Sequence, residues 1–205
     1  MISIINYNTG NLLSIKRMLK KVCELDVFIT NDSELISQSS KIILPGVGHF
    51  DYGIQQLNNS GLIPLLNDLV FKKKIPILGI CLGAQLMTRG SEEGLENGLG
   101  WVEAETVAFD RSRFPNSFKI PHMGWNDINI EKEFSLFFDM PNQIRFYFVH
   151  GFHLLMDNYH DIWLTTEYGY RFCAAYQVKN IYACQFHPEK SHKFGMKLME
   201  NFANI

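Results

Sequence analysis

The first half of the chain alternates short apolar runs with segments whose apolar residues recur every three or four positions. Runs rich in Ile, Leu and Val predict buried strands, and the longer periodic segments predict amphipathic helices. The strands are predicted at residues 2–6, 27–30, 41–44 and 75–80, and the helices at 12–22, 51–57, 62–71 and 83–89. Apolar strands that alternate with helices are typical of a parallel sheet covered on both faces.

The second half has shorter strands that follow one another across turns such as Tyr168-Gly169-Tyr170. They are predicted at residues 101–109, 124–130, 145–150, 162–167, 173–177 and 181–186. We expect some of them to form antiparallel pairs at the sheet edge. Ser191 is the predicted N-cap of a final helix. The whole pattern predicts one α/β domain over residues 1–205: a three-layer, mostly parallel sheet with helices on both faces and an added antiparallel section.

Composition is that of an ordinary globular protein. The 205 residues are 46% hydrophobic and 20% charged, with a formal net charge of −2. This charge gives no basic surface for nucleic acid, and no apolar stretch approaches the roughly 18 residues of a membrane span. The N-terminus lacks the pattern of a signal peptide. The four cysteines are scattered, so we expect a cytoplasmic protein without disulfides and without nucleic-acid or membrane partners.

Cys81 is the first candidate for chemistry, because it ends a predicted strand between Gly79 and Gly83. Small neighbours permit a strained strand-to-helix turn that projects a nucleophile above the sheet. The start of a helix also favours the thiolate, which is the attacking form of cysteine. A buried cysteine that acts only as a small apolar residue fits the same run.

His187, Pro188 and Glu189 follow the last predicted strand. If that strand is parallel to residues 75–80, His187 lies at the same rim as Cys81. His187 could then serve as base and acid, with Glu189 fixing its tautomer through the other ring nitrogen. A surface turn that caps the final helix explains this segment equally well.

The segment Pro45-Gly46-Val47-Gly48 follows a third predicted strand. Its glycines free backbone N–H groups at Val47 and Gly48 which, with the amide of Leu82, could hold the oxyanion of a tetrahedral intermediate. Taken alone, the same residues also fit a tight turn.

The sequence predicts neither a metal site nor a cofactor. His150 and His153 are three residues apart on a predicted strand and would point to opposite faces, which argues against joint metal ligation. A Gly-rich phosphate loop of the Walker or dinucleotide form is also missing from the sequence.

Two segments, 79–85 (GICLGAQ) and 185–191 (QFHPEKS), resemble the catalytic signatures of the class I, or triad, glutamine amidotransferases. Within that family the chain is similar to the glutaminase subunits of imidazole glycerol phosphate synthase. The resemblance covers essentially the whole chain. The supporting segments are 7–12 (YNTGNL), 44–50 (LPGVGHF), 119–126 (KIPHMGWN) and 146–150 (FYFVH).

The resemblance implies that Cys81 attacks the side-chain amide of L-glutamine. His187 would protonate the departing ammonia and later activate water, with Glu189 holding it. Glutamine would be bound by Gln85 and by the backbone of the segment that contains Phe148, His150 and Gly151. In this family the 45–48 segment is the suspected switch that keeps the glutaminase nearly silent until a partner binds its own ligand.

The resemblance also implies a heterodimer. The ammonia would pass through a channel to a (β/α)₈-barrel cyclase, which forms imidazole glycerol phosphate in histidine biosynthesis. A tryptophan in a short polar loop suits an interface, although a core tryptophan fits the sequence as well. The face toward the partner is expected to include Met123, Trp125, Asn126, Tyr147 and Lys190.

The chain departs from the family pattern at a few positions near these motifs, namely His49, Ala84, Gly151 and His153. Such changes suit a paralogue that supplies ammonia for amidination of a surface-polysaccharide sugar, which is one alternative. A second is a stand-alone cysteine hydrolase, which Gln85 and the 121–126 segment disfavour. A third is a scaffold without activity, against which the intact triad argues.

Overall fold

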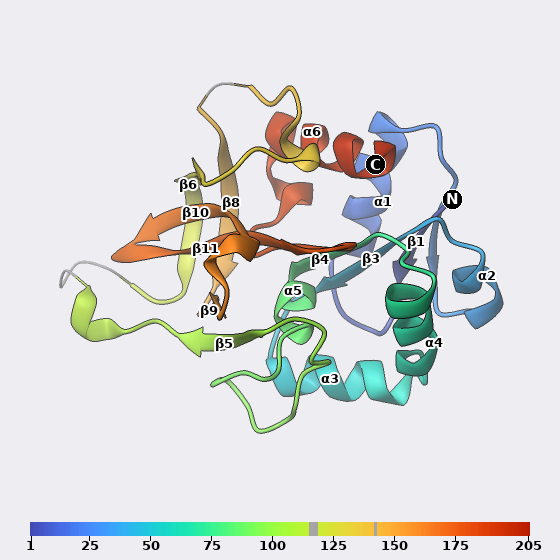
Figure 1. Ribbon diagram of the computed structural model, residues 1–205, viewed down its shortest axis with the longest axis horizontal. Helices are drawn as coiled ribbons and strands as arrows, with labels where there is room; N and C mark the ends of the chain where they lie inside the picture. Colours follow the sequence, from blue (N-terminus) through green and yellow to red (C-terminus); the bar gives the residue numbers. More distant parts are fainter. Residues whose placement is uncertain (115–118, 142) are drawn as a thin grey trace.

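The computed structural model describes residues 1–114, 119–141 and 143–205, and its centre is one large sheet (Figure 1). The parallel part is formed by β1 (Ile2–Ile5), β2 (Val27–Thr30), β3 (Lys41–Gly46), β4 (Ile77–Cys81) and β12 (Ile181–Cys184). Their order is β2–β1–β3–β4–β12. Each neighbouring pair is parallel, so β12 lies beside β4 as the sequence predicts.

Beyond β12 the sheet becomes antiparallel, which confirms the added section. The strands there are β11 (Tyr170–Val178), β10 (Ile162–Tyr168) and β7 (Asn129–Ile130), and β9 (Phe152–Met156) pairs with both β11 and β5 (Ala104–Ala108). A separate two-stranded ribbon consists of β6 (His122–Asp127) and β8 (Arg145–His150).

Helices cover both faces of the sheet (Figure 1). One face carries α1 (Leu12–Val22) and α6 (His192–Asn204), and the other carries α3 (Phe50–Asn59), α4 (Ile63–Asn67) and α5 (Leu82–Leu86). The shorter elements are α2 (Ser33–Ser37), η1 (Asp68–Lys72), η2 (Arg111–Arg113), η3 (Ser135–Phe137), η4 (Tyr159–Asp161) and η5 (Pro188–Lys190). In the described part of the chain, no helix is long and apolar enough to cross a membrane.

The apolar strands divide their side chains between two cores. In β4, Leu78 and Ile80 pack in the core on the α1 and α6 side, whereas Ile77 packs in the core under α3 and α4. In β12, Tyr182 packs in the core on the α1 and α6 side, and Ala183 packs in the core under α3 and α4. Successive side chains of a strand point to opposite faces, so strands that are apolar at every position bury both faces.

Some local predictions are wrong. α5 ends at Leu86 rather than near residue 89, because the hydroxyl of Thr88 bonds to the carbonyl oxygens of Gln85 and Gly90 and the chain turns back. β9 and α2 form where no element is predicted. α6 does begin after Ser191, but the Ser191 hydroxyl does not cap it. It donates instead to the carbonyl of His187 and accepts from the N–H of Tyr147.

The turn between β4 and α5 adopts the strained geometry expected of a nucleophile elbow. Cys81 has φ 52° and ψ −110°, which a side-chain-bearing residue rarely adopts. The adjacent backbones are too close for larger neighbours. A Cβ on Gly83 would lie 1.8 Å from the carbonyl oxygen of Leu44, and one on Gly79 would lie 2.8 Å from Cα of Ala84. The two glycines therefore allow α5 to pack directly on β3 and β4.

We predict that Gly83→Ala destabilises the fold by about 1–3 kcal/mol, because the added methyl group must displace the β3 backbone. Urea denaturation of the purified chain measures this free energy of unfolding. Gly151→Ala is the matched control, since its Cβ would meet only Ile120 at 3.9 Å, and a change within about 0.5 kcal/mol is expected. Equal midpoints for Gly83→Ala and the parent chain would contradict the packing argument.

Candidate active site

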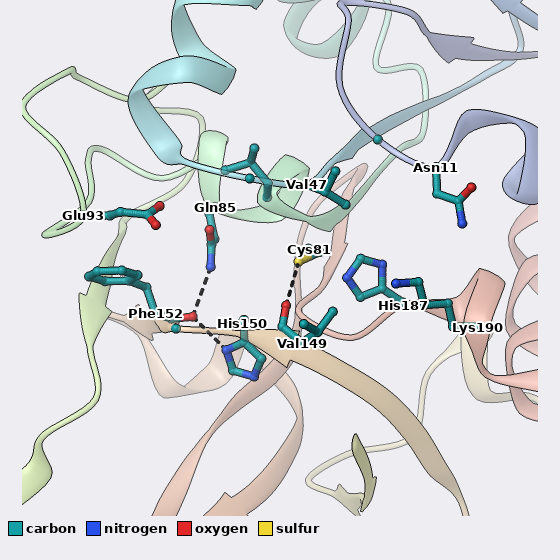
Figure 2. A pocket seen from close by; sticks show the side chains of 14 residues that line it. Asn11, Val47, Cys81, Gln85, Glu93, Val149, His150, Phe152, His187 and Lys190 are labelled. Atoms are coloured by element: carbon teal, nitrogen blue, oxygen red, sulfur yellow. Dashed lines mark hydrogen bonds between the residues drawn. The ribbon is translucent and has the colours of Figure 1, made fainter. Parts of the chain in front are cut away.

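The carboxyl ends of β3, β4 and β12 lie at one edge of the sheet and border a cavity of about 500 Å³ (Figure 2). Open α/β sheets bind ligands at this edge. The end of β8 and the start of β9 close the opposite side of the cavity. The lining residues are Gly10, Asn11, Val47, Gly48, Cys81, Leu82, Gln85, Glu93, Val149, His150, Gly151, Phe152, His187 and Lys190.

Cys81 reaches the cavity from the elbow and is 6% exposed. Its Sγ lies 3.9 Å from the carbonyl oxygen of Val149 and 3.8 Å from Nε2 of Gln185. Both are long contacts that hold the sulfur only weakly. α5 has five residues, so its dipole gives less support to a thiolate than the longer predicted helix would.

His187 and Glu189 form a buried pair directly beyond β12. Nδ1 of His187 lies 2.8 Å from Oε1 of Glu189, and both side chains are 1% exposed. Pro188 opens the short turn η5, which returns the Glu189 carboxylate to the imidazole ring. Among the described residues, Nε2 of His187 has no hydrogen-bond partner. The ring lies beside Cys81 (Figure 2), so the structure brings the three predicted residues together.

The pKa of His187 reflects this position. Burial lowers the pKa, but Cys81 and Glu189 raise it, and the net result is an increase from 6.5 to about 10. Anionic neighbours in a low-dielectric pocket favour the charged imidazolium. A protonated His187 next to Cys81 is the arrangement found in thiolate–imidazolium pairs.

The predicted oxyanion residues Val47, Gly48 and Leu82 all line the cavity, but the Val47 amide is already engaged. The Val47 N–H donates to Oγ1 of Thr9 at 3.1 Å, and the Thr9 hydroxyl donates to the Val47 carbonyl at 2.7 Å. Gly48 follows with φ 102°, a conformation that glycine adopts without strain. In this structure the Val47 amide is therefore not free to bind an oxyanion.

Three of the four predicted glutamine-binding residues line the cavity. Nε2 of Gln85 donates to the Phe152 carbonyl at 3.1 Å and to Oε1 of Gln185 at 3.2 Å. His150 and Gly151 border the same space. Phe148 does not line it: it lies on the same face of β8 as His150 but two residues earlier, and its side chain is fully buried in the core, where it contacts Phe186.

Sequence reasoning missed Glu93, Asn11 and Gln185. Glu93 belongs to a polar loop that looks solvated in the sequence, yet its carboxylate borders the cavity and accepts the N–H of Phe50 at 2.8 Å. Gln185 is the first residue of the 185–191 motif, so the sequence could have predicted its place near Cys81. Its amide contacts both Gln85 and Cys81.

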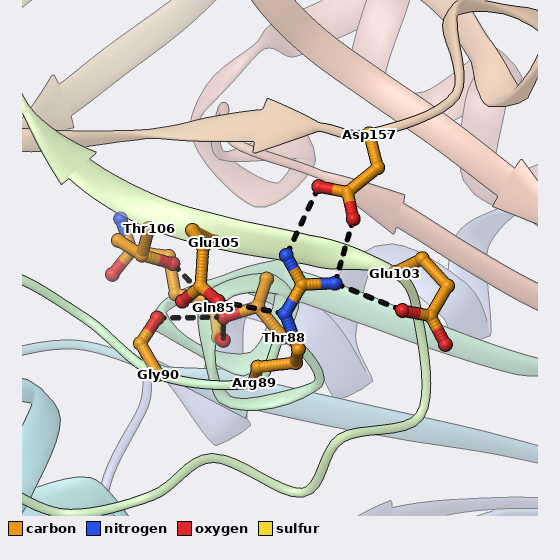
Figure 3. Close-up of polar contacts among 8 residues, drawn as sticks. All are labelled: Gln85, Thr88, Arg89, Gly90, Glu103, Glu105, Thr106 and Asp157. Atoms are coloured by element: carbon orange, nitrogen blue, oxygen red, sulfur yellow. Dashed lines mark hydrogen bonds and ion pairs between the residues drawn. The ribbon is translucent and has the colours of Figure 1, made fainter.

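Arg89, at the start of the loop that also contains Glu93, is the centre of an ion-pair cluster (Figure 3). The guanidinium bonds to Glu105 at 2.7 Å and to Glu103 at 2.9 Å, and it contacts both carboxylate oxygens of Asp157 at 2.8 and 3.0 Å. Because the Arg89 side chain is 38% exposed, each pair contributes modestly. Together the contacts connect the loop after α5 to β5 and to the end of β9.

The predicted partner-facing residues lie on and beside the β6–β8 ribbon. Met123 and Trp125 are 62% and 41% exposed, which excludes the core position that the sequence left open for Trp125. The Trp125 ring stacks on His192 at 5.6 Å. Tyr147 is partly buried, with the Lys190 ammonium 5.7 Å from its ring centroid. Asn126 is also partly buried, and its side-chain amide bonds within the chain.

Comparisons with known proteins identify the relatives of this chain. The profile of the family "Glutamine amidotransferase class-I" matches residues 3–205. "Imidazole glycerol phosphate synthase subunit HisH 2" of Methanococcus maripaludis is 52% identical over 98% of both chains, and the protein of the same name from Pseudomonas aeruginosa is 43% identical over 100% of both.

A solved structure agrees in fold. The structure of PurLQS from Thermotoga maritima superposes with a TM-score of 0.70 at 18% identity, covering 99% of this chain and 97% of that one. At this identity the likeness bears on the fold alone. The profile and the close relatives establish that the chain belongs to the class-I glutamine amidotransferases and, within them, to the HisH family of imidazole glycerol phosphate synthase subunits.

Proposed function

We propose that the chain hydrolyses L-glutamine to glutamate and ammonia with Cys81, His187 and Glu189 as its catalytic triad. The observation that carries the proposal is the convergence of the elbow cysteine with the buried His187–Glu189 pair at one cavity. Family membership supports the reaction class, and this geometry supports the role proposed for each residue.

The proposed reaction has two steps. The Cys81 thiolate adds to the amide carbon of glutamine, and the tetrahedral intermediate collapses as the C–N bond breaks and His187 protonates the leaving nitrogen. This step releases ammonia and leaves a γ-glutamyl thioester on Cys81. His187 then takes a proton from water, which attacks the thioester, and glutamate leaves as the thiolate is restored. Glu189 stabilises the imidazolium and fixes its tautomer through Nδ1.

The cavity supplies groups suited to the ends of glutamine. Its volume of about 500 Å³ falls within the range for small-molecule sites. The carboxylate of Glu93 is suited to the α-ammonium group, and Gln85 together with the backbone at Gly151 is suited to the polar remainder. These assignments rest on proximity to the cavity and on chemical complementarity.

The chain also needs an acceptor for its ammonia. Free ammonia is largely protonated in neutral water and loses its nucleophilicity, so transfer inside a complex is favoured. We propose that the partner is a cyclase and that the pathway is histidine biosynthesis, since the relatives are named as imidazole glycerol phosphate synthase subunits. Met123 and Trp125 are exposed on the strand paired with β8, whose end borders the cavity, and they suit this contact.

The alternatives receive less support. A polysaccharide-pathway paralogue and a stand-alone cysteine hydrolase both remain compatible with the triad, but the relatives described above carry the synthase name over the full chain. A stand-alone hydrolase also leaves the exposed apolar face of the ribbon without a role.

Cys81→Ala should abolish glutamine-dependent synthesis by the complex with its cyclase while ammonia-dependent synthesis stays at the parent rate. Loss of the nucleophile removes the covalent step, so a decrease of roughly 10³-fold or more is expected. Steady-state assays with glutamine and with ammonium salt measure the two rates. Loss of both rates would point to a structural role for Cys81, and loss of neither would remove it from the mechanism.

The isolated chain should hydrolyse glutamine slowly, and the cyclase with its bound ligand should accelerate it by orders of magnitude. The reason is the engaged Val47 amide, which leaves the oxyanion site incomplete. Glutamate release by the chain alone, with the partner, and with the partner plus ligand gives the comparison. Equal rates under the three conditions would rule out gating.

Thr9→Val should raise the basal glutaminase rate of the isolated chain, because it removes the two hydrogen bonds that hold the peptide groups on either side of Val47. Each such bond contributes about 0.5–1.5 kcal/mol net, so loss of both removes about 1–3 kcal/mol, and an increase of about 5- to 100-fold is expected. Thr9→Ser keeps the hydroxyl and is the matched control. A basal rate in Thr9→Val that equals the Thr9→Ser rate would show that this contact does not restrain the site.

A further inference from the structure

Two buried histidines lie between the cavity and the outer face of the ribbon. His122 of β6 pairs directly with His150 of β8, and they are 2% and 6% exposed. His150 borders the cavity, whereas His122 is not among the lining residues. Neither the proposed reaction nor the partner contact uses His122, so its burial needs another explanation.

The hydrogen bonds define which ring nitrogens carry protons. Nδ1 of His150 lies 2.8 Å from the carbonyl oxygen of Phe152, which can only accept, so Nδ1 must be the protonated nitrogen. In a neutral ring the Nε2 atom of His150 is then an acceptor. Nδ1 of His122 lies 3.0 Å from this Nε2 and must donate to it.

The same logic extends to Asn126. With Nδ1 protonated, Nε2 of His122 accepts from the Asn126 amide nitrogen at 3.2 Å. That nitrogen also donates to the carbonyl of Glu167 at 2.7 Å, while Oδ1 of Asn126 accepts the N–H of Asp127 at 2.9 Å. Each ring nitrogen therefore has a complementary donor or acceptor. The chain of donated hydrogen bonds runs from Asn126 through His122 and His150 toward the cavity.

Burial supports the neutral form of both rings. It lowers the pKa of His122 from 6.5 to about 4 and holds the pKa of His150 well below 6.5. The His122 ring lies between Phe148 and Tyr168, with centroid distances of 4.7 and 4.1 Å and interplanar angles of 22° and 23°. This aromatic sandwich fixes the plane of the ring and therefore the directions of its two nitrogens.

The chain of hydrogen bonds ends at the Phe152 carbonyl, to which Nε2 of Gln85 also donates at 3.1 Å (Figure 2). His150 and Gln85 therefore share one acceptor. If His150 changed tautomer, it would present a lone pair to that carbonyl, and the resulting repulsion would displace the carbonyl and the Gln85 amide it holds.

We propose that His122 is a positioning residue for glutamine: by donating to His150 it fixes the Nδ1–H tautomer of that ring, and through the Phe152 carbonyl it holds Gln85 in place. The inference rests on the proposed glutaminase function. It also gives the ribbon a physical connection to the cavity, since Asn126, at the other end of the chain, is adjacent to the exposed Trp125.

The kinetic test uses the complex with the cyclase and compares His122→Leu with His122→Asn. Leucine removes the donor, whereas an asparagine amide can place an N–H near the position of Nδ1. His122→Leu should raise KM for glutamine about tenfold, equivalent to one lost hydrogen bond to a buried acceptor, and leave kcat within about twofold. His122→Asn should restore most of the KM, and ammonia-dependent synthesis should be unchanged in both variants.

A kcat loss without a KM change, or a His122→Asn variant as impaired as His122→Leu, would overturn the proposal. A second measurement does not depend on folding of the variants. Imidazole ¹⁵N spectra of the isolated parent chain should show both His122 and His150 as neutral Nδ1–H tautomers between about pH 6 and 8. An Nε2–H tautomer, or titration of either ring in that range, would also overturn it.

The two proposals can fail separately. A parent complex that uses ammonia but not glutamine would reject the glutaminase function while leaving the ¹⁵N pattern intact. Normal glutaminase activity with the wrong tautomers would reject only the role of His122.

Discussion

The close approach of α5 to the backbones of β3 and β4 is the constraint on which the site depends. At the turn that leads into α5, Cys81 has a positive φ, at a cost of about 1–3 kcal/mol that the surrounding packing must offset. Gly83 lies directly against the Leu44 carbonyl, so the turn after β3 and the first amide of α5 are brought to the same rim. The candidate nucleophile Cys81, the candidate oxyanion residues and Gln85 all lie close to this packing contact.

The β6–β8 ribbon is the second organising element, and its backbone is hydrogen-bonded to the turn that carries His187, both directly and through the Ser191 hydroxyl. The Tyr147 carbonyl accepts the N–H of His187 at 2.9 Å, and the Tyr147 N–H donates to the Ser191 hydroxyl at 3.0 Å. Ser191 in turn bonds to the His187 carbonyl. The turn that carries His187 is therefore held by Tyr147 of β8. The residue paired with Tyr147 on β6 is Trp125, which is exposed.

Sequence reasoning succeeds where local pattern and chemistry coincide. Cys81, His187 and Glu189 each follow an apolar strand, and parallel pairing of β4 with β12 is enough to bring them to one edge. It fails where a role depends on contacts across the chain. Glu93 reaches the cavity only because the loop after α5 folds back onto β5, and the Thr9 contact with Val47 joins two turns 38 residues apart. The side chain of Phe148 likewise lies in the core because it packs against Phe172 and Phe186 from other parts of the chain, whereas the predicted role of this segment in binding glutamine concerns its backbone.

The pair of hydrogen bonds between Thr9 and Val47 has a consequence in terms of populations. Loss of both bonds costs about 1–3 kcal/mol, so the alternative orientation of the two peptide groups is expected in a minority of molecules, roughly 1–15%. Such a fraction keeps an unpartnered chain from consuming much glutamine. Contacts made when a partner docks could reverse the ratio of the two orientations, because they need to favour the minority orientation by only a few kcal/mol.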